Sequence, residues 1–263
     1  MAQQAELSFH HTTATPHREA SLDPHIQYGS CSNTRSSRAG FAQSQTRYSS
    51  IHDPSLSDLG MRQCARLKAH LKTELPAEMV ENIGLILVSP MRRTIQTALW
   101  SMDWLLQKGV PIQASAGWQE NSDHPCDTGS PISALKEEFP QIDYSSLDPV
   151  FPEKNSQAAD RYRYNRQAIL ARSQTCLGEL YSLQVKAVIV VSHSGFLRQG
   201  VTGCWFDNAD YRIFDIHKDQ PVNTFTLRQW DKTKAGGLGL SWTEETELGQ
   251  GLPEDSSLST ASE

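Results

Sequence analysis

The feature that most constrains the fold of this chain is a short apolar run, Ala187 to Val191, which ends abruptly at Ser192-His193-Ser194-Gly195. The run is rich in β-branched side chains and predicts a strand that is buried on both faces. Phe196 and Leu197 then begin a pattern compatible with a helix. Polar residues at the carboxyl end of such a strand lie where open α/β sheets bind ligands. His193 is therefore a candidate site residue, although one histidine alone is more often structural.

A second unit of the same kind precedes it in the chain. Residues 84–88 are apolar, Ser89-Pro90 forms a polar turn, and a helical pattern follows from Met91 to about Gln107. One further helical pattern begins after Ser57, and another extends over residues 160–183. Repeated strand–helix units predict an α/β fold, a three-layer α/β/α sandwich with a mainly parallel central sheet.

Composition restricts the class of protein. The net charge of −6 over 263 residues argues against a nucleic-acid partner. No apolar run is long enough for a transmembrane helix, and the amino terminus does not resemble a signal peptide. Five scattered cysteines fit reduced thiols in an intracellular protein. We therefore expect a cytoplasmic or also nuclear protein without a membrane partner. The sequence gives no indication of its oligomeric state.

Three segments are expected along the chain. Residues 1–47 are rich in Ser, Thr, Gln and His and predict a poorly ordered or atypical segment, apart from a short strand at 6–9. Residues 48–230 form the expected folded domain. Residues 231–263 are Gly-rich and then acidic and Ser-rich, which predicts a disordered polar tail.

Two further residues are candidates for chemistry. Arg93 lies in the first turn of the helix after Ser89-Pro90, where a guanidinium and the helix amino terminus together favour a phosphate or carboxylate. Glu120 lies in a long polar loop, residues 117–130, close to Trp118. A carboxyl group beside an aromatic surface can keep its proton near neutral pH, as a general acid must. Taken singly, a surface arginine and a loop glutamate are usually solvated.

Other catalytic classes do not fit the spacing. Ser192 and Ser194 lack the flanking glycines of a nucleophile elbow. The sequence contains neither a phosphate-binding loop of the Walker type nor a dinucleotide fingerprint. His193 has no carboxylate or histidine nearby at metal-ligand spacing, so we expect no metal and no cofactor.

Taken together, the motifs resemble the histidine phosphatase superfamily, the phosphoglycerate-mutase-like fold, and in particular its fungal-type members. They occur in the family's order: Asp53-Pro-x-Leu-x-x-x-Gly60, Ser89-Pro-x-x-Arg93-x-x-Gln96-Thr97, Gln119-Glu120 with Pro125-Cys-Asp-Thr-Gly129, Ser192-His193-Ser-Gly-Phe-Leu-Arg198 and Trp205-Phe206-x-Asn208-Ala-Asp-Tyr211-Arg212. The resemblance covers roughly residues 48–216.

The resemblance implies metal-independent hydrolysis of phosphomonoesters through a phosphohistidine. By position, Arg93 resembles a phosphate-cradling arginine and His193 the second histidine of the site, with Ser194 beside it as a further phosphate-binding residue. Glu120 resembles the acid that protonates the leaving oxygen. The implied partner is a phosphorylated small molecule or a phosphoprotein. Specificity in this family lies in loops, here residues 117–130 and 143–155, in which Trp118, His124 and Phe151 are candidate contacts.

The family's first motif, an Arg-His-Gly or Arg-His-Ala triplet with the nucleophilic histidine, is missing, because this sequence contains no Arg-His dipeptide. Residues 40–44, Gly-Phe-Ala-Gln-Ser, occupy the expected place without a histidine. Three explanations remain open. Residues 1–47 are a diverged or wrongly assigned start, or the protein is a pseudophosphatase that binds a phospho-ligand or protein without turnover, or His11 substitutes as the nucleophile.

Overall fold

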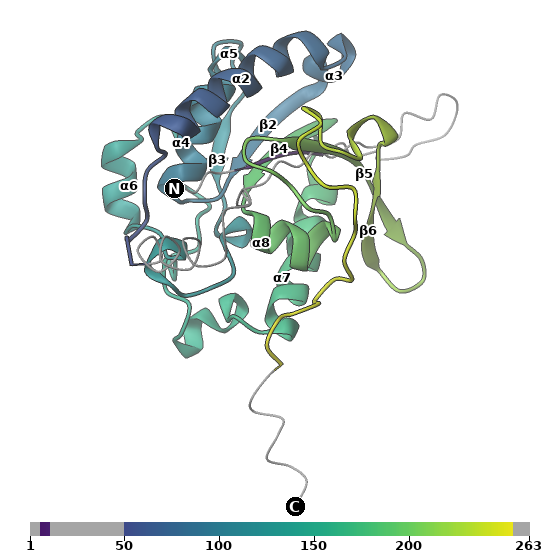
Figure 1. Cartoon of the computed structure of the whole chain (residues 1–263). Coiled ribbons are helices and arrows are strands. Elements are labelled where there is room, and N and C mark those ends of the chain that lie inside the picture. The colour runs from purple at the N-terminus through teal and green to yellow at the C-terminus, as the bar shows by residue number, and fades with distance from the viewer. Residues whose placement is uncertain (1–5, 11–49, 255–263) are drawn as a thin grey trace, which may run out of the picture.

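The computed structural model describes residues 6–10 and 50–254. A six-stranded sheet forms the middle of the fold, in the order β3-β2-β4-β1-β5-β6 (Figure 1). The strands are β1 (Glu6–His10), β2 (Ile83–Val88), β3 (Ile112–Ala114), β4 (Ala187–Ser192), β5 (Tyr211–Asp219) and β6 (Thr224–Gln229). The two strands predicted beside the site, β2 and β4, are adjacent and parallel, and β3 pairs parallel with the other side of β2.

Helices cover both faces of the sheet, which confirms the expected α/β architecture (Figure 1). The helices are α2 (Asp58–Glu74), α3 (Ala77–Asn82), α4 (Arg92–Ser101), α5 (Asp103–Leu106), α6 (Ile132–Glu138), α7 (Arg166–Ser182) and α8 (Ser194–Phe196). The last is continued by a π-helical turn, η4 (Leu197–Thr202). Short 3-10 turns are η1 (Ala116–Trp118), η2 (Pro125–Asp127), η3 (Gln157–Tyr162) and η5 (Asp231–Thr233).

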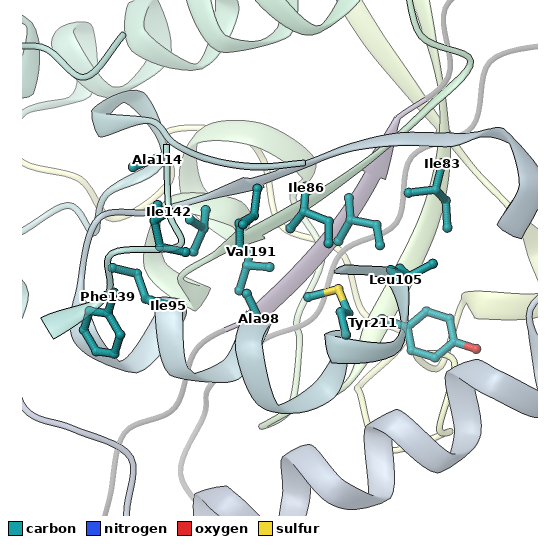
Figure 2. Packing of buried hydrophobic residues seen from close by; sticks show 14 of the residues in the cluster. Ile83, Ile86, Ile95, Ala98, Leu105, Ala114, Phe139, Ile142, Val191 and Tyr211 are labelled. Carbon is teal, nitrogen blue, oxygen red and sulfur yellow. The ribbon is translucent and has the colours of Figure 1, made fainter. Parts of the chain in front are cut away.

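The alternation of side chains along β4 divides the core into two layers. Ile189 and Val191 pack on the side of α4, and Figure 2 shows Val191 above Ile95 and Ala98 of that helix. The intervening residues of β4 point to the other face, where α7 and α8 lie. The apolar run from Ala187 to Val191 is buried, as predicted, and Ser192, which ends the strand, is buried as well.

Helix boundaries depart from the sequence prediction at two places. The helix expected from Met91 to Gln107 is divided at Met102 into α4 and α5. The helix expected over 160–183 is preceded by the separate turn η3, and α7 begins only after Asn165. The side chain of Asn165 accepts a hydrogen bond from the backbone N–H of Ala168, so it caps the helix and fixes its start.

The direction of β1 bears on the missing nucleophile. This strand pairs antiparallel with β4, so Glu6 lies opposite Ser192 and His10 lies opposite Val188. The carboxyl end of β1 therefore lies at the end of the sheet opposite to His193. His11, one candidate for the nucleophile, lies outside the described residues.

The carboxy-terminal segment differs from the expectation of a disordered tail from 231 onwards. Residues 231–254 lie against the domain. Two buried side chains, Asp210 just before β5 and Arg212 on β5, form hydrogen bonds with this segment. The carboxylate of Asp210 accepts hydrogen bonds from the backbone of Leu238 and Leu240 and from the hydroxyl of Ser241. The guanidinium of Arg212 donates to the carbonyls of Lys234 and Trp242. Residues 255–263 lie outside the described residues.

Within residues 6–10 and 50–254, no helix combines the length and the apolar character that crossing a membrane requires.

Candidate active site

Three loops meet where β2, β3 and β4 end. Val88 pairs with Val191 in register, and the backbone N–H of Ser89 donates to the carbonyl of Val191 at 2.8 Å. The backbone N–H of Ser115, just after β3, donates to the carbonyl of Val88. The strand ends are therefore level, and the turns that follow them face one another across one edge of the sheet.

Arg93 points into this edge. Its side chain is 2% exposed, and its guanidinium donates to the carbonyl of Cys126 at 2.5 Å and to Asp127 Oδ1 at 3.2 Å. The neighbouring Arg92 instead points outward and pairs with Glu138 at the surface. The two arginines, which the sequence presents as a pair, thus have different roles: Arg93 is a buried, oriented donor and Arg92 is a surface ion pair.

His193 is held between two groups. Its Nε2 atom lies 2.7 Å from Ser89 Oγ, and its Nδ1 atom lies 3.0 Å from Arg93 Nη2. A guanidinium can only donate, so Nδ1 must be the acceptor and the ring proton of a neutral imidazole is on Nε2. Nε2–H then donates to the hydroxyl oxygen of Ser89. From the sequence, Ser89 was predicted only to form part of the turn.

The electrostatic environment keeps this ring neutral. Burial lowers the pKa of His193 well below its usual value of 6.5. The positive charges of Arg93, Lys154 and Arg172 lower the pKa further. Cationic side chains gathered around a neutral histidine favour the binding of an anion such as a phosphate group.

Glu120 lies against the amino-terminal end of α8. Its Oε1 atom accepts from the backbone N–H groups of Asn121 and Phe196, both at 2.9 Å, and its Oε2 atom makes a longer contact of 3.3 Å with the N–H of Gly195. Burial, and next the negative charge of Asp127, raise the pKa of Glu120. A carboxyl group that holds its proton more tightly than usual is suited to donate it to a leaving oxygen.

Asp53 joins two of the loops. It is fully buried, with one carboxylate oxygen accepting from the N–H of Arg92 at the start of α4 and the other from the N–H of Ser130. Its φ of 39° lies in the left-handed region, which aspartate tolerates better than most residues. Gln96 has a similar function, since its side chain accepts from the N–H of Leu56. Asp53 and Gln96, which belong to the motifs quoted above, therefore connect the segments that surround the site.

Ser194, predicted to bind phosphate, is the first residue of α8 and is partly exposed. It makes no side-chain hydrogen bond to any residue of the described part of the chain. Two of the candidate substrate contacts are placed elsewhere: Trp118 and Phe151 are 1% and 3% exposed and belong to the core. A large apolar side chain can either contact a substrate or pack in the core, and the sequence does not distinguish these roles. In the folded chain both side chains pack in the core. His124 is exposed.

Two residues without a role predicted from the sequence take part in the site. Asp127 is one partner of Arg93 and also accepts from the hydroxyl of Ser122. Lys154 is buried and contacts the loop that carries Glu120. Asp127 belongs to a quoted motif and could have been singled out there, whereas no local pattern distinguishes Lys154. Within the described residues, no three His, Cys, Asp or Glu side chains are grouped so that they could hold a metal ion.

Comparison with known proteins agrees with this geometry. The model of the histidine phosphatase superfamily (branch 1) matches residues 38–227, which is most of the chain. The chain belongs to the histidine phosphatase superfamily. The match begins before residues 40–44, the segment that we expect at the place of the family's first motif, and that segment lies outside the described residues.

Individual relatives are of the same kind. A protein named "Probable phosphatase" from Schizosaccharomyces pombe is 32% identical over 151 residues, which cover 56% of this chain and 65% of the relative. A "Phosphoglycerate mutase-like protein" from Arabidopsis thaliana is 26% identical over 77% of this chain and 81% of its own length. A second Arabidopsis protein, "Phosphoglycerate mutase-like protein 1", is 27% identical, with 58% of its length matched. The chain thus spans less than two thirds of the length of two of these relatives.

Proposed function

We propose that this protein hydrolyses phosphomonoesters, with Arg93 and His193 binding the phosphoryl group and Glu120 protonating the leaving oxygen. The observation that carries the proposal is the contact of Arg93 with His193, which places a guanidinium and a neutral imidazole side by side at the carboxyl edge of the sheet. Membership of the histidine phosphatase superfamily supports it.

The chemistry follows from the charges. The phosphoryl oxygens carry negative charge throughout the transfer, and donors fixed in advance stabilise them without reorganisation. The hydrogen bonds of Arg93 to Cys126 and Asp127 fix the orientation of its guanidinium in advance. We propose Ser194, at the start of α8, as a further donor. Family resemblance implies that a histidine nitrogen forms a bond to phosphorus while the ester oxygen leaves, and that water later cleaves the phosphorus–nitrogen bond.

Glu120 supplies the proton for the departing oxygen. Its two oxygens differ, because Oε1 accepts two short hydrogen bonds and Oε2 accepts one long one. The proton is therefore placed on Oε2, which is the less engaged atom. The substrate class that we propose is a phosphorylated small molecule or phosphoprotein whose leaving group reaches this atom.

The test is hydrolysis of p-nitrophenyl phosphate by the purified 263-residue chain, with His193→Ala as the inactive control. Phosphatase function predicts turnover that His193→Ala abolishes, and an acid-labile phosphoenzyme detectable by phosphorus NMR. Binding of orthovanadate without turnover would instead identify a phospho-ligand binding protein. Absence of both turnover and vanadate binding would contradict the site assignment.

A further inference from the structure

Lys154 carries a buried amino group whose hydrogen bonds, among the residues that the structure describes, go to the backbone of one loop. It is 3% exposed, and its Nζ atom donates to the carbonyl oxygens of Glu120 at 2.8 Å, Ser122 at 2.6 Å and Asp127 at 2.6 Å. The partners lie 34, 32 and 27 residues away in the chain. The contacts therefore join the loop of residues 143–155 to the loop of residues 117–130.

The number of contacts limits what Lys154 can do. An ammonium group has three N–H donors, and each of them has a carbonyl partner here. No donor remains for a phosphate oxygen unless one of these hydrogen bonds breaks. Lys154 is thus placed to fix the loop and not to bind the phosphoryl group.

The loop of residues 117–130 carries both the proposed proton donor, Glu120, and a residue that orients Arg93, Asp127. The carbonyl of Glu120 belongs to the residue whose carboxyl group we assign as the proton donor. The carbonyl of Asp127 belongs to the residue whose carboxylate pairs with Arg93. One ammonium group therefore sets the position of the acid relative to the arginine.

Burying this group is unfavourable, which argues that its position matters. Burial lowers the pKa of Lys154, and the negative charge of Asp127 opposes this effect. A leucine or methionine could fill the same space without the cost of removing a charge from water. It could not satisfy the three partly buried carbonyls, each of which would lose a partner.

We propose that Lys154 is a positioning residue for proton transfer, which holds Glu120 at the distance from the phosphate site that the leaving oxygen requires. The proposal rests on the function proposed above. It predicts that loss of Lys154 lowers kcat only for substrates whose leaving group must be protonated. Phenyl phosphate releases a basic phenolate that needs a proton, whereas p-nitrophenolate leaves readily without one.

The experiment compares kcat and KM for phenyl phosphate and p-nitrophenyl phosphate in Lys154→Met, Lys154→Arg and the wild-type chain. Lys136→Met, which removes an exposed lysine of α6, is the matched control. We expect Lys154→Met to lower kcat for phenyl phosphate by about 10- to 100-fold, and kcat for p-nitrophenyl phosphate by less than about 3-fold. Lys154→Arg, which keeps the charge and several donors, should recover part of the loss.

Several results would overturn the proposal. Equal losses on both substrates would indicate a general structural role, and no loss on either would show that the loop holds its position without Lys154. If Lys154→Met does not fold, Lys154→Gln, which keeps two N–H donors, must show the same preference between substrates.

Amide hydrogen exchange separates this proposal from the proposed function. Faster exchange in residues 119–130 of Lys154→Met, with the rest of the domain unchanged, is expected whether or not the chain turns over. A wild-type chain that hydrolyses neither substrate would contradict the phosphatase function and the catalytic role of Lys154 together. Unchanged exchange in an active variant would contradict the role of Lys154 alone.

Discussion

Nδ1 of His193 accepts a hydrogen bond from Nη2 of Arg93, at 3.0 Å, so the arginine determines which nitrogen of the histidine carries the proton. The same Nη2 atom also donates to Asp127 Oδ1 at 3.2 Å. A phosphate group that binds here must share these donors. The two residues are thus coupled, and a change in either alters what the other presents to an anion.

The first prediction concerns the protonation of His193. In nitrogen NMR spectra the free protein should show a neutral ring with the proton on Nε2, and this ring should remain neutral as the pH falls through 6.5. Binding of phosphate or vanadate should raise its pKa, because the anion offsets the surrounding positive charge. A ring in the free protein that titrates near 6.5 would contradict the burial argument.

The same shift predicts how stability depends on pH. Below 6.5 the unfolded chain takes up a proton at His193 before the folded chain does, since the folded pKa is lower. The contribution of His193 to the free energy of unfolding is therefore complete above pH 6.5, and it is lost as the pH falls towards the pKa of the folded state. Urea unfolding at pH 5 to 8 should show this slope, and His193→Asn should reduce it.

The second prediction concerns Arg93. Arg93→Ala should weaken vanadate binding by about 100-fold, because it removes two charge-assisted hydrogen bonds of about 1.5 kcal/mol or more each. Arg92→Ala is the matched control, since that side chain pairs with Glu138 at the surface. Isothermal calorimetry measures both. Equal affinities in the two variants would show that Arg93 has a structural role only.

The third prediction uses the close approach of α8 to Glu120. A Cβ atom at Gly195 would lie 2.5 Å from Oε1 of Glu120, so the carboxylate would have to move. We expect Gly195→Ala to destabilise the protein by about 1–3 kcal/mol. Thermal unfolding of Gly195→Ala, Glu120→Ala and the double variant tests this.

In the Glu120→Ala background the added methyl group should cost much less, because the clashing atom is gone. Additive effects of the two substitutions would mean that the strain arises elsewhere in the turn.

The fourth prediction concerns Asp53, whose two carboxylate oxygens accept from Arg92 N and Ser130 N. Asp53→Asn replaces one acceptor by an N–H donor that would face a backbone N–H. We expect a loss of about 1–3 kcal/mol in the free energy of unfolding, measured with urea. Glu137→Gln, an acid-to-amide change at an exposed residue of α6, should have little effect. Similar losses in both would show that the buried contacts of Asp53 do not matter.

Much of the fold could be predicted because its signals are local. The apolar runs of β2 and β4 and the polar turns after them are visible within a few residues, and most residues of both strands are buried. The turns also indicated Arg93 and His193. Parallel strands end at one edge, so the sequence implied that these residues would be close.

The structure decided the contacts between distant segments. Nothing near Lys154 indicates that its ammonium group meets three carbonyls about thirty residues earlier, and nothing near Asp210 indicates that it organises residues 238–241. A buried charge is placed by whichever partners the folded chain brings to it, and those partners are not encoded in its neighbours. The sequence by itself therefore determined the family and indicated Arg93 and His193 as candidate site residues. Tertiary structure decided how Glu120, Arg93 and the carboxy-terminal segment are held, because their partners lie far away in the chain.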